Sequence, residues 1–378
     1  MQKPKVRFKG FTDDWEQRKF GELVEKYEDI VDTPTEGYTR LGIRSHAKGT
    51  FHSYVEKGKE LETAKMFRVA ANNFIVNITF GWEHAVAITD ENDAGKLVSH
   101  RFPQYSFNEG KLPEFFKYLI LDERFRHHLE LSSPGGAGRN RVLKLNDMLD
   151  YKMSFPRTAE QEKVGRYFSH LDYIITFHQR KCEQTKKLKK YMLQKMFPKE
   201  GQTVPEIRFE GFTDAWEKRK FSDVIEIGSG MDYKHLEEGN VPVYGTGGYM
   251  LSVDKALSDD KDAIGIGRKG TIDKPYILRA PFWTVDTLFY CIPKEDYDLD
   301  FTSCLFQNVN WKKKDESTGV PSLSKVIINN VETITPIFDE QKKIGDYFRI
   351  LDCLITLHQR KCDELQNIKK FMLQNMFI

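Results

Sequence analysis

The chain has 378 residues, of which 39% are hydrophobic and 30% are charged, and its formal net charge is +2 at pH 7. This composition is typical of a globular protein with room for two domains, and no stretch approaches the ~18 apolar residues of a membrane span. A net charge so close to zero does not by itself indicate a nucleic-acid partner. The five cysteines form no C-x-x-C pair and no apolar signal opens the chain, so we expect a cytoplasmic protein with reduced thiols.

Two segments of the chain occur twice. The pattern R-F-x-G-F-T-D-x-W-E-x-R-K-F occupies residues 7–20 and returns at residues 208–221. Residues 161–197 return at residues 341–377, with 21 of 37 positions identical and no gap. The chain therefore consists of an opening motif, a variable middle and a long conserved segment, and then the same three parts again.

The two middles differ far more than the repeated segments around them. Both are rich in aromatic residues, β-branched residues and glycine, and apolar runs at 73–78, 263–266 and 287–292 predict strands. A helix is expected at residues 112–131. We therefore predict two mixed domains, each built around a twisted sheet.

Several loop residues of the first middle are candidates for binding a ligand. Arg40 and Arg44 flank an early apolar turn, and Arg139 and Arg141 stand in a loop of Ser and Gly residues. Arginines in glycine-rich loops can contact phosphate, since the backbone approaches a ligand closely where side chains are absent. The alternative is that these are surface loops with ordinary charge.

The second middle carries a similar set. Arg268 and Lys269 stand between glycines, and Tyr244 and Thr246 belong to the segment Y-G-T-G-G-Y. A closing loop rich in Ser and Gly contains Ser317 and Thr318. Two comparable sets of loops in one chain favour a shared binding role over chance.

The repeated long segment predicts a helix with a partner helix. In both copies apolar or small residues recur at alternating steps of four and three, as at positions 164, 168, 171, 175, 178 and 182. The polar linker between the halves is short, so the second helix has to run antiparallel to the first. We expect two homologous domains at opposite ends of a helix pair ~55 Å long, related by a pseudo-two-fold axis.

Known catalytic and cofactor motifs are not found in the sequence. Residues 265–270 match G-x-G-x-x-G, but Pro275 prevents the helix that a dinucleotide site needs. His178, Cys182 and their repeats His358 and Cys362 could form a Cys2His2 metal site. The alternative, a hydrogen-bonded polar layer between the helices, agrees better with their spacing.

Taken together, the opening motif, the P-x-x-x-E-Q start of each long helix and the tandem order resemble the specificity subunits of type I restriction-modification systems. The segments V-P-V-Y-G-T-G-G, I-G-R-K-G-T-I and F-W-T-V-D-T-L-F-Y of the second half also resemble a target recognition domain. The first half has N-I-T-F-G-W at residues 77–82 instead. By position in these segments, the resemblance adds Thr79, Trp82 and Thr271 to the candidate DNA-binding residues.

The resemblance implies an α+β fold with two target recognition domains separated by two antiparallel helices that form a coiled coil. The expected parts are a first recognition domain at 1–157, a helix at 158–197, a linker at 198–206, a second recognition domain at 207–338 and a helix at 339–378. Each domain would recognise one half of a bipartite, asymmetric DNA site, and the helices would bind two modification (methyltransferase) subunits, through which restriction subunits join.

A chain of this kind is not an enzyme and needs no cofactor; S-adenosylmethionine, ATP and Mg would belong to the partner subunits, which methylate adenine or cleave DNA. One alternative is a specificity subunit for a fused nuclease-methyltransferase. A different class is a coiled-coil scaffold protein without base-specific DNA binding. Sequence-independent or absent DNA binding would favour the scaffold.

Overall fold

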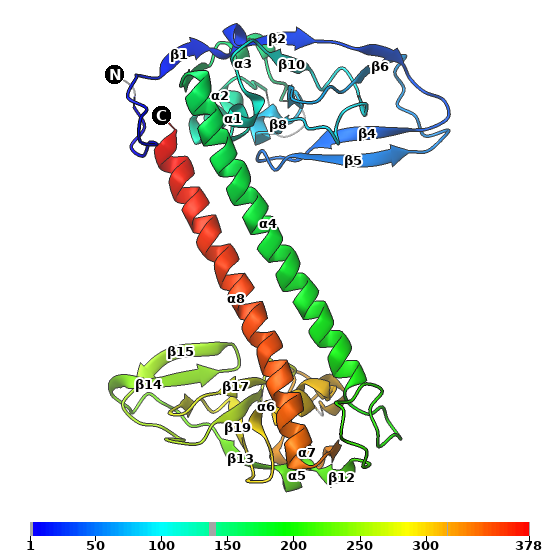
Figure 1. Ribbon diagram of the computed structural model, residues 1–378, viewed down its shortest axis with the longest axis vertical. Helices are drawn as coiled ribbons and strands as arrows, with labels where there is room; N and C mark the ends of the chain where they lie inside the picture. The colour runs from blue at the N-terminus through cyan, green and yellow to red at the C-terminus, as the bar shows by residue number, and fades with distance from the viewer. Residues whose placement is uncertain (1–2, 136–140, 316, 378) are drawn as a thin grey trace. The chain divides into compact units, whose positions relative to one another are not determined.

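The computed structural model describes residues 3–135, 141–315 and 317–377. The chain forms two compact units (Figure 1). The first unit contains residues 1–177 together with 361–378, and the second contains residues 178–360. None of the described helices combines the length and the apolar character that a membrane span requires.

The first unit contains a two-stranded, a four-stranded and a five-stranded sheet, with the orders β1-β11, β2-β10-β7-β8 and β3-β6-β9-β4-β5. Its strands are β1 (Glu16–Lys19), β2 (Val24–Tyr27), β3 (Ile30–Asp32), β4 (Tyr38–Ile43), β5 (Thr50–Val55), β6 (Lys65–Arg68), β7 (Phe74–Val76), β8 (Val86–Ile88), β9 (Leu97–Val98), β10 (Gln104–Phe107) and β11 (Lys152–Phe155). Its helices are η1 (Phe20–Glu22), η2 (Gly81–Glu83), α1 (Pro113–Leu119), α2 (Glu123–Leu131), α3 (Leu145–Leu149), the first part of α4 (Thr158–Lys195) and the last part of α8 (Phe338–Met376).

The second unit contains sheets with the orders β12-β20, β13-β19-β16-β17 and β15-β14-β18. Its strands are β12 (Glu217–Lys220), β13 (Ile225–Ser229), β14 (Glu238–Gly245), β15 (Gly248–Val253), β16 (Ala263–Gly267), β17 (Tyr276–Leu278), β18 (Trp283–Thr284), β19 (Leu288–Pro293) and β20 (Glu332–Thr335). Its helices are the last part of α4, α5 (Phe221–Val224), α6 (Leu299–Asn308), η4 (Trp311–Lys314), α7 (Lys325–Asn329) and the first part of α8.

The two units have equivalent sheets. The antiparallel sheet β2-β10-β7-β8 of the first unit matches β13-β19-β16-β17 of the second in order and direction. In each unit the first strand of a hairpin also pairs in parallel with a short strand, β4 with β9 and β14 with β18. The prediction of a mixed α+β protein with two sheet-rich domains is therefore confirmed, and the strands predicted at 73–78, 263–266 and 287–292 correspond to β7, β16 and β19.

The single helix predicted at residues 112–131 is wrong. The structure divides this segment into α1, which ends at Leu119, and α2, which begins at Glu123. The side chain of Asp122 accepts a hydrogen bond from Arg124 N at 2.7 Å. An aspartate in this position satisfies a backbone N–H of the first turn, so it starts a new helix within the apolar pattern.

The repeated opening motif is joined to the start of each long helix. Strand β1 pairs with β11, and β12 pairs with β20 in the same register pattern. Arg7 Nε and Nη2 donate to the two carboxylate oxygens of Glu160, each at 2.7 Å, and Arg208 makes the same pair of bonds to Glu340. Hydrogen bonding to Glu340 raises the pKa of Arg208 above its ordinary value. These contacts explain why the opening motif and the helix start recur together.

A second pair of matching contacts joins each opening motif to the end of a long helix. In the first unit Val6 N donates to Asn375 O of α8 at 2.9 Å. In the second unit Ile207 N donates to Lys195 O of α4, also at 2.9 Å. The same backbone contact therefore forms twice. In the first unit it joins the opening motif to the end of α8, and in the second unit it joins the opening motif to the end of α4, on the other side of the linker.

Within each unit the two long helices pack in opposite directions. In the first unit Phe168, early in α4, lies 5.7 Å from the ring of Phe377, which follows α8, and Asp172 pairs with Lys369. In the second unit Lys189, late in α4, pairs with Asp352, early in α8, at 2.7 Å. Residues from opposite ends of the two helices meet, as expected for antiparallel packing.

Candidate nucleic-acid interface

The structure brings together the two loops of the second unit that carry predicted DNA-binding residues. Arg268 N donates to Thr287 O at 2.7 Å, and Arg268 O accepts from Leu323 N at 2.9 Å. Gly270 N donates to Pro321 O at 2.8 Å. The turn with Arg268 and Lys269 therefore lies beside the closing loop that contains Ser317 and Thr318, and both basic side chains are exposed.

The closing loop is held by a carboxylate. Asp315 Oδ1 accepts hydrogen bonds from Ser317 N and Ser322 N, both at 3.0 Å. These backbone donors hold the pKa of Asp315 below its ordinary value. Thr318, next to Ser317, is exposed.

The hairpin β14–β15 lies next to the turn of Arg268. Val285 N donates to Tyr244 O at 3.0 Å, while the adjacent Asp286 O accepts from Arg268 Nη1 at 3.4 Å. Tyr276 Oη donates to Gly245 O at 2.6 Å, which fixes the end of β14 just before Thr246. Tyr244, Thr246 and Arg268 thus come from neighbouring segments of one surface.

Thr271 has a different place from the other predicted residues. It is only half-buried, and a Cβ added to Gly267 would lie 2.1 Å from the Thr271 carbonyl oxygen. Only glycine fits at position 267, since the two backbones touch there. The turn 267–271 is therefore tight, and this contact with Thr271 keeps Arg268 and Lys269 at its outer end.

In the first unit two predicted residues line a single groove with a volume of about 780 Å³. Arg40 reaches it from β4, and Thr79 reaches it from the turn after β7. Arg101, which the sequence analysis missed, also lines this groove.

The other predicted residues of the first unit make contacts within the protein. Arg44 Nη1 donates to Thr50 O, and its guanidinium lies 5.3 Å from the ring of Phe51. Arg141 lies 5.3 Å from the ring of Trp82 and donates to Ser133 O at 3.1 Å. Arg139 lies outside the described residues. DNA contact by Arg44 and Arg141 stays a prediction.

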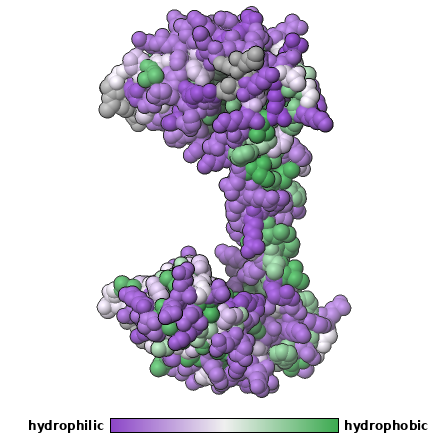
Figure 2. Space-filling view, turned by 90° about the vertical axis from the view of Figure 1, so that its left-hand side faces the viewer, coloured by the Kyte–Doolittle hydropathy of each residue, from purple (hydrophilic) through white to green (hydrophobic). Residues whose placement is uncertain are grey.

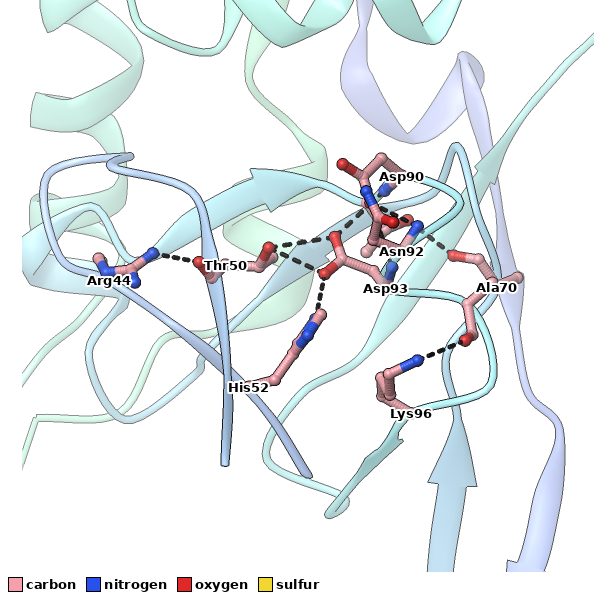
Figure 3. A network of polar contacts seen from close by, with 10 residues as sticks. Arg44, Thr50, His52, Ala70, Asp90, Asn92, Asp93 and Lys96 are labelled. Carbon is pink, nitrogen blue, oxygen red and sulfur yellow. Dashed lines mark hydrogen bonds and ion pairs between the residues drawn. The ribbon is translucent and has the colours of Figure 1, made fainter. Parts of the chain in front are cut away.

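A polar network fixes the hairpin that carries Arg40 (Figure 3). The carboxylate of Asp93 is buried, with 4% of its side chain exposed, and His52 Nε2 lies 2.8 Å from its Oδ1. Thr50 Oγ1 donates to the same carboxylate at 2.9 Å. Thr50 and His52 belong to β5, which pairs with β4, so the network holds the hairpin against the loop that contains Asp93.

The two repeated histidines form a polar contact between the helices. His178 Nδ1 lies 2.9 Å from His358 Nδ1 in the second unit, where Cys182 Sγ donates to Ile355 O at 3.8 Å. In the first unit Cys362 Sγ donates to Ile175 O. Within the described part of the chain no group of three or more His, Cys, Asp or Glu side chains could hold a metal ion. The contacts favour the polar layer over the Cys2His2 alternative.

Comparisons with known proteins agree on one family. Residues 213–367 match the family described as type I restriction modification DNA specificity domain. The chain is 22% identical over 408 aligned residues to the type I restriction enzyme MjaVIII specificity subunit of Methanocaldococcus jannaschii, covering 95% of this chain and 91% of that protein.

Two solved structures share the fold. The S subunit of a type I restriction-modification system from M. genitalium superposes with a TM-score of 0.70 at 16% identity and covers 100% of this chain and 99% of its own. A structure described as the basis of complex assembly and conformational transition of the type I R-M system has a TM-score of 0.50 at 15% identity, with 97% and 98% covered.

Proposed function

We propose, on the premise that this chain belongs to the specificity subunits of type I restriction-modification systems, that it recognises the DNA sequence at which such a system methylates or cleaves. The observation that carries the proposal is the surface of the second unit, where Arg268, Lys269 and the closing loop converge beside the β14–β15 hairpin. Exposed basic side chains on a fixed backbone can contact both phosphates and base edges. The chain is a specificity subunit and not itself a catalyst.

The target is proposed to be bipartite and asymmetric. The four-stranded sheets of the two units have the same order, but the neighbouring sheet has five strands in the first unit and three in the second. The loops that surround the candidate sites differ accordingly, with Arg40 and Thr79 in one groove and Arg268 and Lys269 on one turn in the other unit. Two units with equivalent four-stranded sheets but different loops should recognise two different half-sites.

The long helices are proposed to bind two modification subunits, one at each unit. Hydrophobic side chains are exposed on both helices (Figure 2): Tyr173, Phe177, Ile368 and Phe371 in the first unit, and Leu188, Tyr191, Ile350, Leu354 and Leu357 in the second. Residues three or four positions apart lie on one face of a helix. Exposed apolar patches of this kind mark protein–protein contacts. Restriction subunits would then join through the modification subunits.

The cofactors of the reaction are assigned to those partners. A modification subunit would bind S-adenosylmethionine, and the restriction subunits would use ATP and Mg, while this chain supplies recognition alone. The assembly would act in the cytoplasm, where its DNA is. A fused nuclease-methyltransferase as the partner would leave the role of this chain unchanged.

The test is to map methylated adenines in cells with and without this gene, together with the genes of the partner subunits. We expect methylation at a split sequence that depends on this chain. Purified full-length chain with its modification subunits should bind a duplex with that sequence more tightly than a scrambled duplex. Equal binding to both duplexes and no gene-dependent methylation would favour a scaffold without base-specific binding.

Whether each unit recognises its own half-site can be tested by exchanging a segment of the chain. Replacing residues 21–150 by the corresponding segment of another specificity subunit leaves the repeated opening motif and both long helices in place. We expect one half of the methylated sequence to change while the other half stays the same. A change in both halves would show that the units do not recognise DNA independently.

A further inference from the structure

The turns that face the groove of the first unit correspond to the turns around Arg268 in the second unit. In the second unit Arg268 N donates to Thr287 O at 2.7 Å, and Arg268 O accepts from Leu323 N at 2.9 Å. In the first unit Ile78 N donates to Arg101 O at 3.0 Å, and Ile78 O accepts from Leu143 N at 2.9 Å. Both backbone bonds recur, so Ile78 occupies the position of Arg268.

The position of Arg101 follows from the same comparison. Arg101 O accepts the hydrogen bond from Ile78 N as Thr287 O accepts the bond from Arg268 N, so Arg101 matches Thr287. The strand pairing agrees with this match. Leu97 pairs in parallel with β4, and Trp283 pairs in parallel with β14. Arg101 follows Leu97 by four residues, as Thr287 follows Trp283. The first unit thus has Ile78 where the second unit has Arg268. It has Arg101 where the second unit has Thr287, on the turn that is hydrogen-bonded to Ile78.

We propose that Arg101 supplies in the first unit the base-recognising cation that Arg268 supplies in the second, and that it acts from the groove it shares with Arg40. The inference rests on the proposed function and assigns the recognition site of the first half-site. The ligand is the base edge of double-stranded DNA in the major groove. A guanidinium can donate two hydrogen bonds to guanine O6 and N7 there.

The guanidinium groups of this groove are available for a ligand. Arg101 is exposed and Arg40 is half-buried, and within the described residues neither has an ion-pair or hydrogen-bond partner for its guanidinium. Arg44 and Arg141, by contrast, donate to backbone carbonyls. The groove also contains Glu83, whose carboxylate accepts a hydrogen bond from Ser45 Oγ. Glu62 lines the groove as well, so the formal charges of its two arginines and two glutamates cancel. The two arginines therefore matter as hydrogen-bond donors that DNA can reach rather than as a net positive charge.

The surroundings position both cations. Arg101 is held through its own backbone by Ile78 N. Arg40 lies on β4, whose partner strand β5 is held by the buried Asp93 through His52 and Thr50 (Figure 3). Side chains on a fixed backbone lose less conformational freedom when they bind, which favours specific recognition.

The test uses the full chain assembled with its modification subunits. For the wild type, Arg101→Ala and Arg101→Lys, the methylated sequence is mapped in cells. Methylation rates are then measured on duplexes that carry each single base-pair change in the half-site assigned by the exchange of residues 21–150. The matched control is Arg126→Ala, which removes an exposed arginine on α2 that pairs with Glu123.

We expect Arg101→Ala to reduce discrimination at one position of the first half-site by about 5- to 150-fold, with the second half-site unchanged. Arg101→Lys keeps the charge but lacks the two parallel donors, so it should lose discrimination while retaining most of the affinity. If the alanine variant fails to fold, as judged by thermal unfolding, the lysine variant decides.

Three outcomes would overturn the inference. The first is unchanged discrimination in both variants, and the second is an effect on the second half-site. The third is a uniform loss of affinity for all sequences with a weaker salt dependence, which indicates a phosphate contact. Failure of the proposed function is distinct from these, because the wild-type protein would then show no sequence-dependent methylation at all.

Discussion

Removal of one partner of the buried ion pair between Arg208 and Glu340 should strongly destabilise the second unit. The perturbation is Glu340→Ala, which removes the acceptor of two hydrogen bonds of 2.7 Å. Only 1% of the Glu340 side chain and 12% of the Arg208 side chain are exposed. The substitution therefore leaves a largely buried guanidinium with its remaining hydrogen bond to Asp214 O.

The expected loss can be estimated from this geometry. Breaking a buried pair by removing one partner typically costs 3 to 5 kcal/mol, because the other charge stays buried. The pair borders a pocket of about 480 Å³ that is open to solvent, so we expect a value near the lower end, about 3 kcal/mol. For a unit of this size each kcal/mol lowers Tm by about 2 to 4 °C, which gives a shift of about 6 to 12 °C.

The assay is urea unfolding of the full chain, followed by tryptophan fluorescence, since Trp216 is buried in the same unit. The control is Glu217→Gln, which removes a surface pair with Arg219 and should change stability by less than about 0.5 kcal/mol. Glu160→Ala should have an effect similar to that of Glu340→Ala on the first unit, through Arg7. A loss below about 1 kcal/mol for both alanine variants would refute the reasoning, because the pairs would then behave as surface pairs.

Further predictions concern recognition, assembly and pH. Arg268→Ala should relax specificity by roughly 1 to 3 kcal/mol in one half-site, whereas Lys269→Ala should weaken binding to all sequences alike, as measured by duplex competition at several salt concentrations. Leu357→Glu, at an exposed apolar position of α8, should weaken association with a modification subunit in sedimentation experiments while leaving Tm unchanged. Two lysines, Lys195 and Lys199, lower the pKa of Glu206 from 4.5 to about 2. Its ion pairs therefore stabilise the fold above pH 4.5, and the difference in Tm between wild type and Glu206→Gln should vanish as the pH falls from about 4.5 towards 2; a constant difference would contradict this assignment.

Internal repetition made much of the fold predictable. Two repeated segments, with 21 of 37 positions identical and an apolar period, predicted α4 and α8. The recurring opening motif predicted the tandem order, but not the ion pairs through which Arg7 and Arg208 join it to the helix starts. The prediction did not extend to the break in the helix at residues 112–131. The apolar period continues through Asp122, and only the hydrogen bond of its side chain to a backbone N–H marks the start of α2.

The candidate site was predictable only where it lies on a continuous motif. Arg268 and Lys269 stand between glycines, and this local signal is visible in the sequence. Arg101 has no such signal, because it lines the groove through the parallel pairing of β4 with β9, which brings together residues about 60 positions apart. The sequence also did not show the internal contacts of the candidate arginines, since Arg141 donates to Ser133 O and Arg268 donates to Asp286 O across turns that only the fold brings together.

The matching junctions at Val6–Asn375 and Ile207–Lys195 have a consequence for how genes of this kind can be rearranged. The backbone contact is the same whether or not a linker of nine residues, 198–206, joins its two sides. We therefore expect that the fold tolerates a break or a linker at either junction. A gene in which the second half precedes the first, with a linker added from Asn375 to Val6, should encode the same folded protein. In evolutionary terms, a half-length ancestor that associated with its own copy could be duplicated and fused without any change in its contacts, and recombination between related genes could then exchange one middle at a time.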